Sequence, residues 1–229
     1  MNVLLTHGYF IQDDPKEQKI MRPYPPLGLL YVSAWLEKHG YYNEVFDSTF
    51  SSFDTLKGRL LQSPPDVLAI YTNLMTKLNV LKIIELVRSN EVLKSTKIVL
   101  GGPEVRNHKE NFLRSGADVL VLGEGEETML ELVKCYDQNK GIEGVQSIAY
   151  LKGDRVVETP ERMLMKDLDE LPLPNRAKID MQAYFSAWKN KHGESAISIN
   201  TMRGCPYTCK WCSRAVYGLS YRRRSPKHV

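Results

Sequence analysis

The sequence is poor in cysteine and contains no long apolar run. Only four of its 229 residues are cysteine, and three of them are crowded into the segment 205–212. Such crowding excludes a disulfide framework and indicates a reducing compartment, so we expect a cytoplasmic protein. No apolar run approaches the ~20 residues of a bilayer span. Met1 leads directly into a strand-like segment without the basic start of a signal peptide, so we also expect no membrane span.

Charge of either sign is not in large excess. The net charge is +4 at pH 7, and acids and bases nearly balance outside the last eight positions, which argues against a nucleic-acid partner. The basic residues near the end are Arg222, Arg223, Arg224 and Lys227. We interpret this cluster as a solvated face; contact with an anionic cofactor is the alternative.

Two nucleotide-binding motifs are also missing. No G-x-G-x-x-G follows the first expected strand, and no G-x-x-x-x-G-K-[ST] occurs anywhere in the chain. The first absence argues against a dinucleotide-binding domain, and the second argues against a phosphate-binding P-loop. A sheet in this chain would therefore hold another kind of ligand, or none.

Short apolar runs alternate with amphipathic ones from residue 1 to residue 140. The runs predict strands over Val3–Thr6, Glu44–Asp47, Val67–Tyr71, Lys97–Leu100 and Asp118–Leu122. The amphipathic segments predict helices over Leu27–His39, Phe53–Gln62, Leu78–Arg88, Lys109–Ser115 and Glu126–Tyr136. This alternation is typical of an α/β fold with a doubly wound, five-stranded parallel sheet, and we expect a flavodoxin-like strand order. Cys135, in the last helix, is predicted to be a small buried core residue.

Small residues gather in the loops that follow the expected strands. In a parallel sheet these loops meet at one edge, where ligands bind, and glycine lets a bulky ligand approach the backbone. The predicted binding residues are Thr72, Asn73, Gly101, Gly102, Gly123, Glu124 and Gly125. The plainer interpretation is that Gly101 and Gly102 only form a turn and that Glu126 and Glu127 only favour a helix start.

The pattern changes after residue 140. Segment 141–192 is predicted to contain a β-hairpin, Ser147–Leu151 and Arg155–Glu158, and an ordered linker whose leucines must be buried. Segment 193–229 is predicted to begin with a strand over Ala196–Thr201 that enters the cysteine-rich loop. The chain is thus divided into a first domain at 1–140, a hairpin and linker at 141–192, and the start of a second domain at 193–229.

Cys205, Cys209 and Cys212 form a C-x-x-x-C-x-x-C pattern. Three thiolates on one tight loop can hold three corners of a 4Fe-4S cluster and leave the fourth iron open to a small molecule. A zinc site that adds His192 or His228 is the alternative, although structural zinc sites usually pair two such knuckles. A reduced trio without metal is the third interpretation.

At this point the chain resembles a known family, the radical S-adenosylmethionine (SAM) proteins that carry a cobalamin-binding domain, which include the anaerobic Mg-protoporphyrin ester cyclase and carbon methylases. The segments that carry the resemblance occur in the family's order: Pro25–Tyr31, Lys38–Gly40, Gly101–Pro103, Gly116–Asp118, Gly123–Glu126, Leu168–Pro174 and Arg203–Pro206.

The resemblance implies a cobalamin domain on the N-terminal side of a radical SAM (β/α) barrel. It implies that a 4Fe-4S cluster on the three cysteines cleaves SAM to a 5′-deoxyadenosyl radical, for methyl transfer or rearrangement at an unactivated carbon of a small-molecule substrate. It also implies an electron donor such as flavodoxin or ferredoxin. Trp211 resembles the aromatic residue that commonly shields the cluster; packing within the loop is its plainer role.

Two departures from the family pattern matter. The D-x-H-x-x-G motif, which supplies a histidine to cobalt, is absent, so we expect cobalamin to bind without a protein histidine on cobalt. A barrel needs about 200 residues, and only its first strand and cluster loop are expected here. We therefore expect the isolated chain to be an inactive part of a radical SAM enzyme; a non-catalytic cobalamin-binding module is the alternative.

Overall fold

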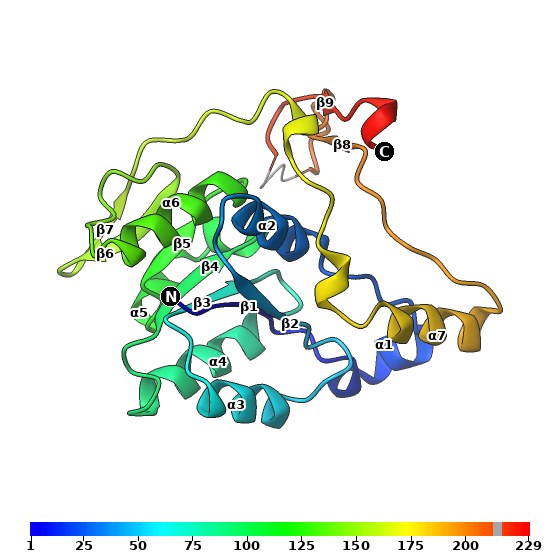
Figure 1. Ribbon diagram of the computed structural model, residues 1–229, viewed down its shortest axis with the longest axis horizontal. Helices are drawn as coiled ribbons and strands as arrows, with labels where there is room; N and C mark the ends of the chain where they lie inside the picture. The colour runs from blue at the N-terminus through cyan, green and yellow to red at the C-terminus, as the bar shows by residue number, and fades with distance from the viewer. Residues whose placement is uncertain (213–216) are drawn as a thin grey trace.

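A seven-stranded mixed sheet with helices on both faces forms the body of the molecule (Figure 1). The structure is a computed structural model and describes residues 1–212 and 217–229. The strands are β1 (Val3–His7), β2 (Asn43–Phe46), β3 (Val67–Tyr71), β4 (Lys97–Gly101), β5 (Val119–Val121), β6 (Ile148–Lys152), β7 (Arg155–Glu158), β8 (Met202–Arg203) and β9 (Arg222–Arg223). The helices are α1 (Pro15–Ile20), α2 (Leu27–Lys38), α3 (Phe53–Gln62), α4 (Lys77–Ser89), α5 (Lys109–Arg114), α6 (Glu126–Asp137) and α7 (Met181–His192). Short 3-10 helices are η1 (Ile11–Asp13), η2 (Pro103–Arg106), η3 (Leu168–Glu170), η4 (Arg176–Lys178) and η5 (Pro226–His228).

The strand order is β2-β1-β3-β4-β5-β6-β7, and the first five strands run parallel. The order 2-1-3-4-5 is the flavodoxin-like one, which confirms the predicted doubly wound sheet. In this order β1 and β3 are neighbours although 59 residues separate their ends (67 − 7 − 1). The carboxyl ends of β1, β3, β4 and β5 therefore meet at one edge.

Successive side chains of each strand point to opposite faces of the sheet. They form two apolar cores, one on each face. Val3 and Leu5 of β1 join the core under α2 and α6, while Leu4 joins the core under α3, α4 and α5. Because both faces are covered, the central strands are continuous apolar runs rather than alternating ones. Figure 1 shows α2 and α6 on one side of the sheet and α3 and α4 on the other.

The predicted hairpin forms, but it belongs to the sheet. β6 pairs antiparallel with β5, and β7 pairs with β6 across the Gly153-Asp154 turn. The five parallel strands are therefore part of a seven-stranded mixed sheet and do not form a separate five-stranded sheet, as the sequence had predicted. The reason is burial: Ile148 and Ala149 of β6 are 0% exposed and fill the two cores beside β5. The division of the chain at residues 140 and 192 stays a prediction.

The linker is anchored to the sheet by η3 and α7. Leu168 and Leu171 are buried in the core under α2, whereas Leu164 and Leu173 are exposed, so the predicted burial of the linker leucines holds for only part of them. Helix α7 was not predicted; its Tyr184 hydroxyl donates to Asp47 Oδ2 at 2.7 Å, and its Trp188 Nε1 donates to the Pro23 carbonyl at 2.8 Å. α1 was also missed, because six residues are too few to show a helical period.

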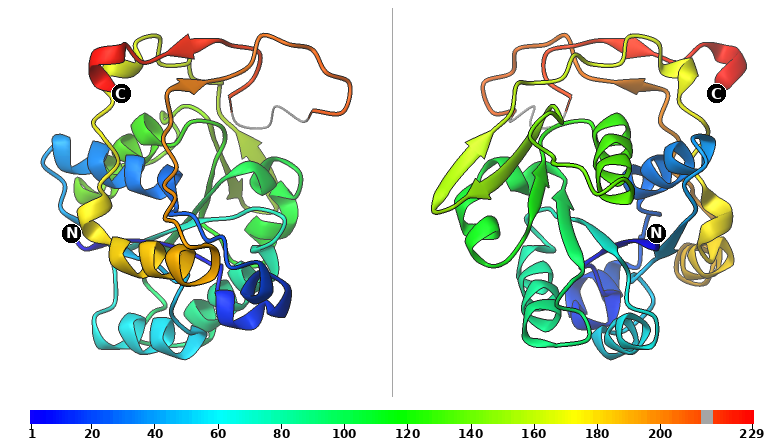
Figure 2. Two further views of the ribbon diagram at one scale, coloured as in Figure 1. Left: turned by 90° about the vertical axis from the view of Figure 1, so that its right-hand side faces the viewer. Right: turned by 60° about the vertical axis from the view of Figure 1, so that its left-hand side comes forward.

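The prediction of a strand at Ala196–Thr201 is wrong. Those residues run in irregular backbone, and the strand is the two-residue β8, which pairs antiparallel with β9. A first barrel strand would need a parallel neighbour, and the described residues of this part supply only the short antiparallel ribbon β8–β9. In both views of Figure 2 the ribbon lies at the opposite end of the molecule from α3 and α4. None of the helices described here has the length and apolar character to cross a membrane.

Candidate cofactor site

A cleft of about 470 Å³ opens at the carboxyl edge of the parallel strands. Its floor is formed by Leu5, Ala69, Val99 and Val121, one from each of β1, β3, β4 and β5. The walls come from the loops after these strands and from the first turns of α2 and α6; they are Pro25 to Leu29, Val32, Tyr71, Gly101 to Pro103, Gly123 to Glu126 and Met129. The cleft is therefore mostly apolar and lies where parallel sheets bind ligands.

Five of the seven predicted binding residues line this cleft, namely Gly101, Gly102, Gly123, Glu124 and Gly125. Gly102 has φ +105°, and a Cβ there would lie 2.2 Å from the Thr72 carbonyl oxygen. A side chain at this position would thus collide with backbone that cannot move aside. Gly123 has φ +101° as well. Both positions need glycine, which keeps the rim low and open.

Thr72 and Asn73 lie behind the rim rather than on the wall of the cleft. Asn73 Oδ1 accepts hydrogen bonds from the amides of Met75 at 2.9 Å and Thr76 at 3.0 Å, so this side chain shapes the turn into α4. Thr72 is 0% exposed, and its Oγ1 has no hydrogen-bond partner among the described residues. A buried hydroxyl without a partner is unusual, but this one lies outside the lining of the cleft.

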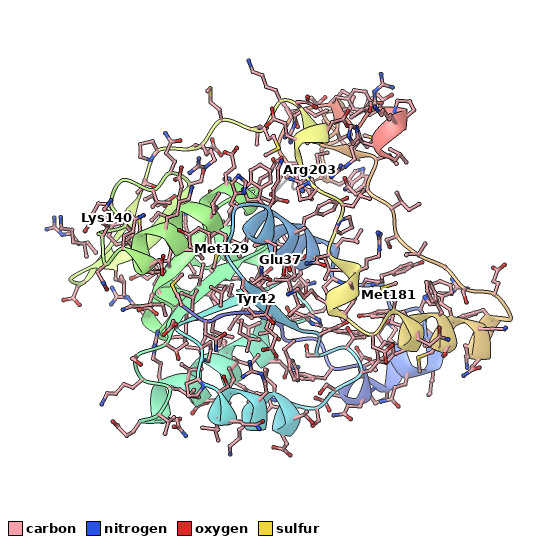
Figure 3. All side chains as sticks on the ribbon, viewed as in Figure 1. Glu37, Tyr42, Met129, Lys140, Met181 and Arg203 are labelled. Carbon is pink, nitrogen blue, oxygen red and sulfur yellow. The ribbon has the colours of Figure 1, made fainter. Side chains whose placement is uncertain are left out.

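Four polar residues of the cleft were not predicted as binding residues: Tyr71, Glu126, Arg203 and Tyr217. Arg203 and Tyr217 come from the C-terminal part of the chain, far from the sheet in sequence. Their local pattern carries no signal of contact with the strands. Figure 3 labels Arg203 above α2, on the side of the molecule where the ribbon lies.

Arg203 is the best-buried charge of the site, with a side chain 3% exposed. Its Nη1 donates to Glu126 Oε2 at 3.2 Å, and its Nη2 contacts Glu126 Oε1. Burial lowers the pKa of Arg203, but the charge and hydrogen bonds of Glu126 outweigh it and raise the pKa above its ordinary value. The guanidinium also lies 5.4 Å from the ring centroids of both Tyr31 and Tyr217. This arginine is therefore permanently charged and held on several sides.

The interpretation of the terminal basic cluster as a solvated face is wrong for two of its arginines. Arg222 Nη1 donates to Glu124 Oε2 at 3.1 Å, and Arg224 Nη1 donates to the Leu171 carbonyl at 3.0 Å. Arg224 is 7% exposed. Arg224 is buried and Arg222 is half-buried because the β8–β9 ribbon turns them toward the linker and toward the acidic loop after β5. Only Arg223 of the three points outward and is exposed.

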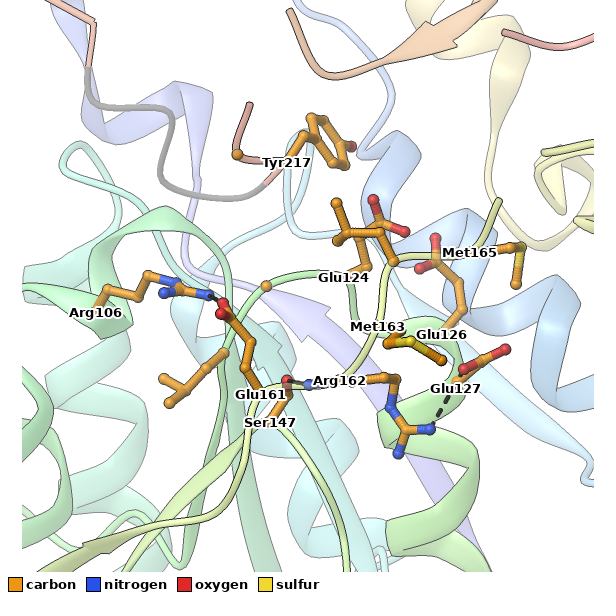
Figure 4. A pocket seen from close by; sticks show the side chains of 14 residues that line it. Arg106, Glu124, Glu126, Glu127, Ser147, Glu161, Arg162, Met163, Met165 and Tyr217 are labelled. Atoms are coloured by element: carbon orange, nitrogen blue, oxygen red, sulfur yellow. Dashed lines mark hydrogen bonds and ion pairs between the residues drawn. The ribbon is translucent and has the colours of Figure 1, made fainter. Parts of the chain in front are cut away.

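A second hollow of about 350 Å³ lies beside the cleft and shares Gly123, Glu124, Glu126 and Tyr217 with it (Figure 4). Its other wall comes from linker residues 161–165. Arg162 Nη1 donates to Glu127 Oε2 at 3.3 Å across this hollow, and Arg106 Nη2 donates to Glu161 Oε1 at 3.1 Å. Glu127 is thus paired with the linker, whereas Glu126 is paired with the ribbon.

The three cysteines lie in the loop between β8 and β9. Cys209 and Cys212 are exposed and Cys205 is half-buried. Among the described residues, no group of three or more His, Cys, Asp or Glu side chains is arranged to hold a metal ion. The donor chemistry suits an iron-sulfur cluster, because three thiols follow one another on a single exposed loop. Trp211 is 88% exposed.

The histidines of the zinc alternative are engaged elsewhere. His192 Nε2 lies 3.0 Å from the Ile20 carbonyl oxygen, and His228 Nδ1 lies 3.1 Å from Asp169 Oδ2. His7, at the end of β1, has Nε2 2.9 Å from Asp47 Oδ1 and accepts the Tyr9 amide at Nδ1. Cys135 is half-buried at the edge of the core, less covered than predicted. It lies near the end of α6, whereas the first turn of that helix lines the cleft.

A family model described as B12 binding domain matches residues 19–133. The chain belongs to this family. Residues 19–133 include α2 to α5, most of α6 and four of the five parallel strands, so the match covers most of the elements that form the cleft. A mostly apolar cleft with a low glycine rim suits a large corrin ligand.

Known proteins show in which context this B12-binding domain occurs. The anaerobic magnesium-protoporphyrin IX monomethyl ester cyclase of Cereibacter sphaeroides is 30% identical over 226 residues, covering 92% of this chain and 35% of that protein. Two solved structures share the fold. One is the radical SAM methyltransferase TsrM of Kitasatospora setae with cobalamin and a 4Fe-4S cluster bound, with a TM-score of 0.74 at 18% identity. The other is the cobalamin-dependent SAM radical enzyme OxsB with aqua-cobalamin and SAM bound, with a TM-score of 0.78 at 21% identity.

The chain spans less than half the length of these relatives. The match with TsrM covers 100% of this chain and 44% of TsrM. The match with OxsB covers 99% of this chain and 30% of OxsB. The matched part is the N-terminal portion of cobalamin-dependent radical SAM enzymes, as the sequence resemblance predicted. The predicted α/β fold is confirmed by the same matches. The reaction of the whole protein is a separate question.

Proposed function

We propose that this chain is the cobalamin-binding, N-terminal portion of a cobalamin-dependent radical SAM enzyme, with a 4Fe-4S cluster on Cys205, Cys209 and Cys212. The observation that carries the proposal is Arg203: it lines the B12-domain cleft, and Cys205 follows it by two positions. This adjacency supports the proposal that the cleft and the cysteine motif are parts of one site. The finer proposal is methyl transfer or rearrangement at an unactivated carbon of a small-molecule substrate.

The chain's own residues would hold and shield the cofactors. Gly101, Gly102 and Gly123 would let the corrin ring lie against the strand ends. When bound, cobalamin would supply the methyl or electron chemistry, and the cluster would supply the electron that cleaves SAM to a 5′-deoxyadenosyl radical. Since His7 is held by Asp47 behind the cleft wall, we propose that cobalt receives no histidine.

The open corner of the cluster is the feature that would make the site reactive. Three cysteines leave one iron for the amino and carboxylate groups of SAM. An external electron donor such as flavodoxin or ferredoxin would approach the exposed loop that carries Cys209 and Cys212. Both the donor and a cytoplasmic location belong to this proposal.

Anaerobic reconstitution with iron and sulfide tests the cluster. We expect a 4Fe-4S Mössbauer spectrum with one distinct iron, a change in the spectrum of the reduced cluster when SAM is added, and loss of iron in Cys209→Ala. Cys135→Ala is the matched control and should load iron like the wild type, because Cys135 lies on α6. Stoichiometric tetrahedral zinc would contradict the proposal.

Titration with hydroxocobalamin tests the cleft and separates the two candidate functions. A non-catalytic cobalamin-binding module would bind hydroxocobalamin but would build no iron cluster that responds to SAM. The cobalt(II) resonance in the paramagnetic resonance spectrum should lack the nitrogen splitting of an axial imidazole. A split resonance that persists in His7→Gln, His39→Gln and His108→Gln would place another nitrogen on cobalt.

A further inference from the structure

Two arginines of the β8–β9 ribbon reach the same acidic loop of the B12-binding domain. Arg203 of β8 lies opposite Arg222 of β9 in the ribbon. Arg203 forms two contacts with the Glu126 carboxylate and a longer one, at 3.4 Å, with Glu124 Oε2, and Arg222 forms two contacts with the Glu124 carboxylate. The ribbon encloses the cysteine loop, residues 204–221. Both stems of that loop are therefore attached to one loop of the cleft wall.

These ion pairs differ from ordinary surface pairs by their burial. The side chains of Arg203 and Glu126 are 3% and 6% exposed, and those of Arg222 and Glu124 are each 11% exposed. Exposed pairs contribute little to structure, since water and salt screen them. At this burial each charge depends on its partner, and the planar arginine fork holds the carboxylate in one orientation.

Three of the four residues also line the cleft itself: Glu124, Glu126 and Arg203. A ligand that fills the cleft removes water from beside the pairs. The attraction within a pair grows when the local dielectric constant falls. A filled cleft should therefore hold the ribbon more firmly, and by thermodynamic reciprocity a firmly held ribbon should favour the ligand.

We propose that Arg203 and Glu126 are positioning residues that couple cobalamin binding in the cleft to the placement of the cysteine loop. Occupation of the cleft fixes the stems of the loop through the Arg203–Glu126 pair, and a cluster on the loop tightens cobalamin binding by the same factor. The inference rests on the proposed function, because it needs both cofactors, but it adds a coupling that neither site requires by itself.

Hydrogen exchange on the full chain measures the coupling directly. In the wild type, hydroxocobalamin should slow amide exchange both at the cleft loop, residues 101–104, and at the ribbon, residues 201–204, the latter by about tenfold. In Glu126→Gln the slowing at residues 101–104 should remain and that at residues 201–204 should be much smaller, because Arg203 then keeps only its 3.4 Å contact with Glu124 Oε2. Glu127→Gln is the matched control, because it makes the same chemical change at the next residue, whose partner is Arg162 of the linker. It should behave like the wild type.

Cobalamin affinity gives a second readout. We expect the dissociation constant of hydroxocobalamin to fall about tenfold when the wild type carries its cluster, and to change by less than twofold in Glu126→Gln. Arg203→Lys keeps the charge without the two-pronged contact. Its ratio of dissociation constants, without and with the cluster, should lie between those of the wild type and Glu126→Gln. Arg223→Lys, on the exposed side of the same ribbon, should show the wild-type ratio.

The outcomes separate this inference from the proposed function. If the wild type binds hydroxocobalamin but its affinity is the same with and without the cluster, the coupling is refuted and the cofactor assignment stands. If the wild type binds no hydroxocobalamin, both are refuted. If Glu126→Gln fails to fold, the wild type and Arg203→Lys decide whether the pair carries the coupling. An equal ratio of hydroxocobalamin dissociation constants, without and with the cluster, in Arg203→Lys and the wild type would refute the role of the arginine fork.

Discussion

At the residue scale, Gly102 is where the loops after β3 and β4 approach most closely. We predict that Gly102→Ala lowers the free energy of unfolding by about 3 kcal/mol and abolishes cobalamin binding, because a Cβ would lie 2.2 Å from the Thr72 carbonyl oxygen. Urea denaturation and hydroxocobalamin titration measure the two effects.

Gly153 provides a matched control for that change. It also has a positive φ, +59°, but a Cβ there meets no described atom within 4 Å. Gly153→Ala should therefore cost only about 1 kcal/mol for the backbone conformation and leave cobalamin binding unchanged. Equal losses of stability in the two variants would show that the contact with Thr72 is not decisive.

Asp47 is the residue from which we expect a pH-dependent stability. Burial raises the pKa of Asp47, but hydrogen bonds with His7, Tyr184 and the Thr49 amide outweigh it, and the pKa lies below the ordinary value. A carboxyl with a lowered folded pKa contributes stability above its unfolded pKa of about 3.9 and loses it as the pH falls through the folded pKa.

Asp47→Asn should therefore be less stable than the wild type at pH 7, and the difference should shrink below about pH 4. Urea denaturation at pH 7 and pH 3 checks this. Glu91→Gln is the control, because the Glu91 side chain is 85% exposed beside Lys94. A stability difference that stays constant from pH 7 to pH 3 would mean that the Asp47 charge has no part in it.

At the scale of elements, α7 links the linker to the sheet through one hydroxyl. Tyr184 donates to Asp47 Oδ2 and also contacts Thr49 Oγ1 at 2.9 Å. We predict that Tyr184→Phe costs about 1–3 kcal/mol, since it leaves a buried carboxylate oxygen without its donor. Faster amide exchange confined to α7 and the strand end at Phe46 would locate the effect.

Tyr42→Phe removes a hydroxyl from a ring that is 73% exposed and serves as the control. It should change stability by less than about 0.5 kcal/mol. If Tyr184→Phe were equally harmless, α7 would owe its position to the apolar packing of Trp188 and Tyr24 rather than to this hydrogen bond.

At the scale of the whole molecule, cobalamin should stabilise the folded chain by mass action. A ligand at 100 times its dissociation constant adds about 2.7 kcal/mol, which corresponds to a rise of about 5–10 °C in melting temperature for a chain of this size. Calorimetry with and without hydroxocobalamin measures the shift, and Gly102→Ala should abolish it. An unchanged melting temperature in the wild type at saturating hydroxocobalamin would contradict the assignment of the cleft.

The local pattern of the sequence determined the five parallel strands, their helices, the glycine rim and the cysteine motif. Each of these depends on residues close together in the chain: apolar runs form buried strands, positive φ requires glycine, and three thiols share one loop. Such features follow from the spacing of residues along the chain, and so they can be predicted from the sequence.

Only the tertiary structure decided which distant segments meet. Glu126 and Arg203 are 77 positions apart in the sequence, and each by itself is typical of a solvated residue. The edge of β5 that accepts β6, and the turn of Arg222 and Arg224 away from water, also depend on packing between distant elements. Periodicity tells which side of an element is apolar, but not which partner covers it, because the partner is chosen by the burial and charge of the assembled fold.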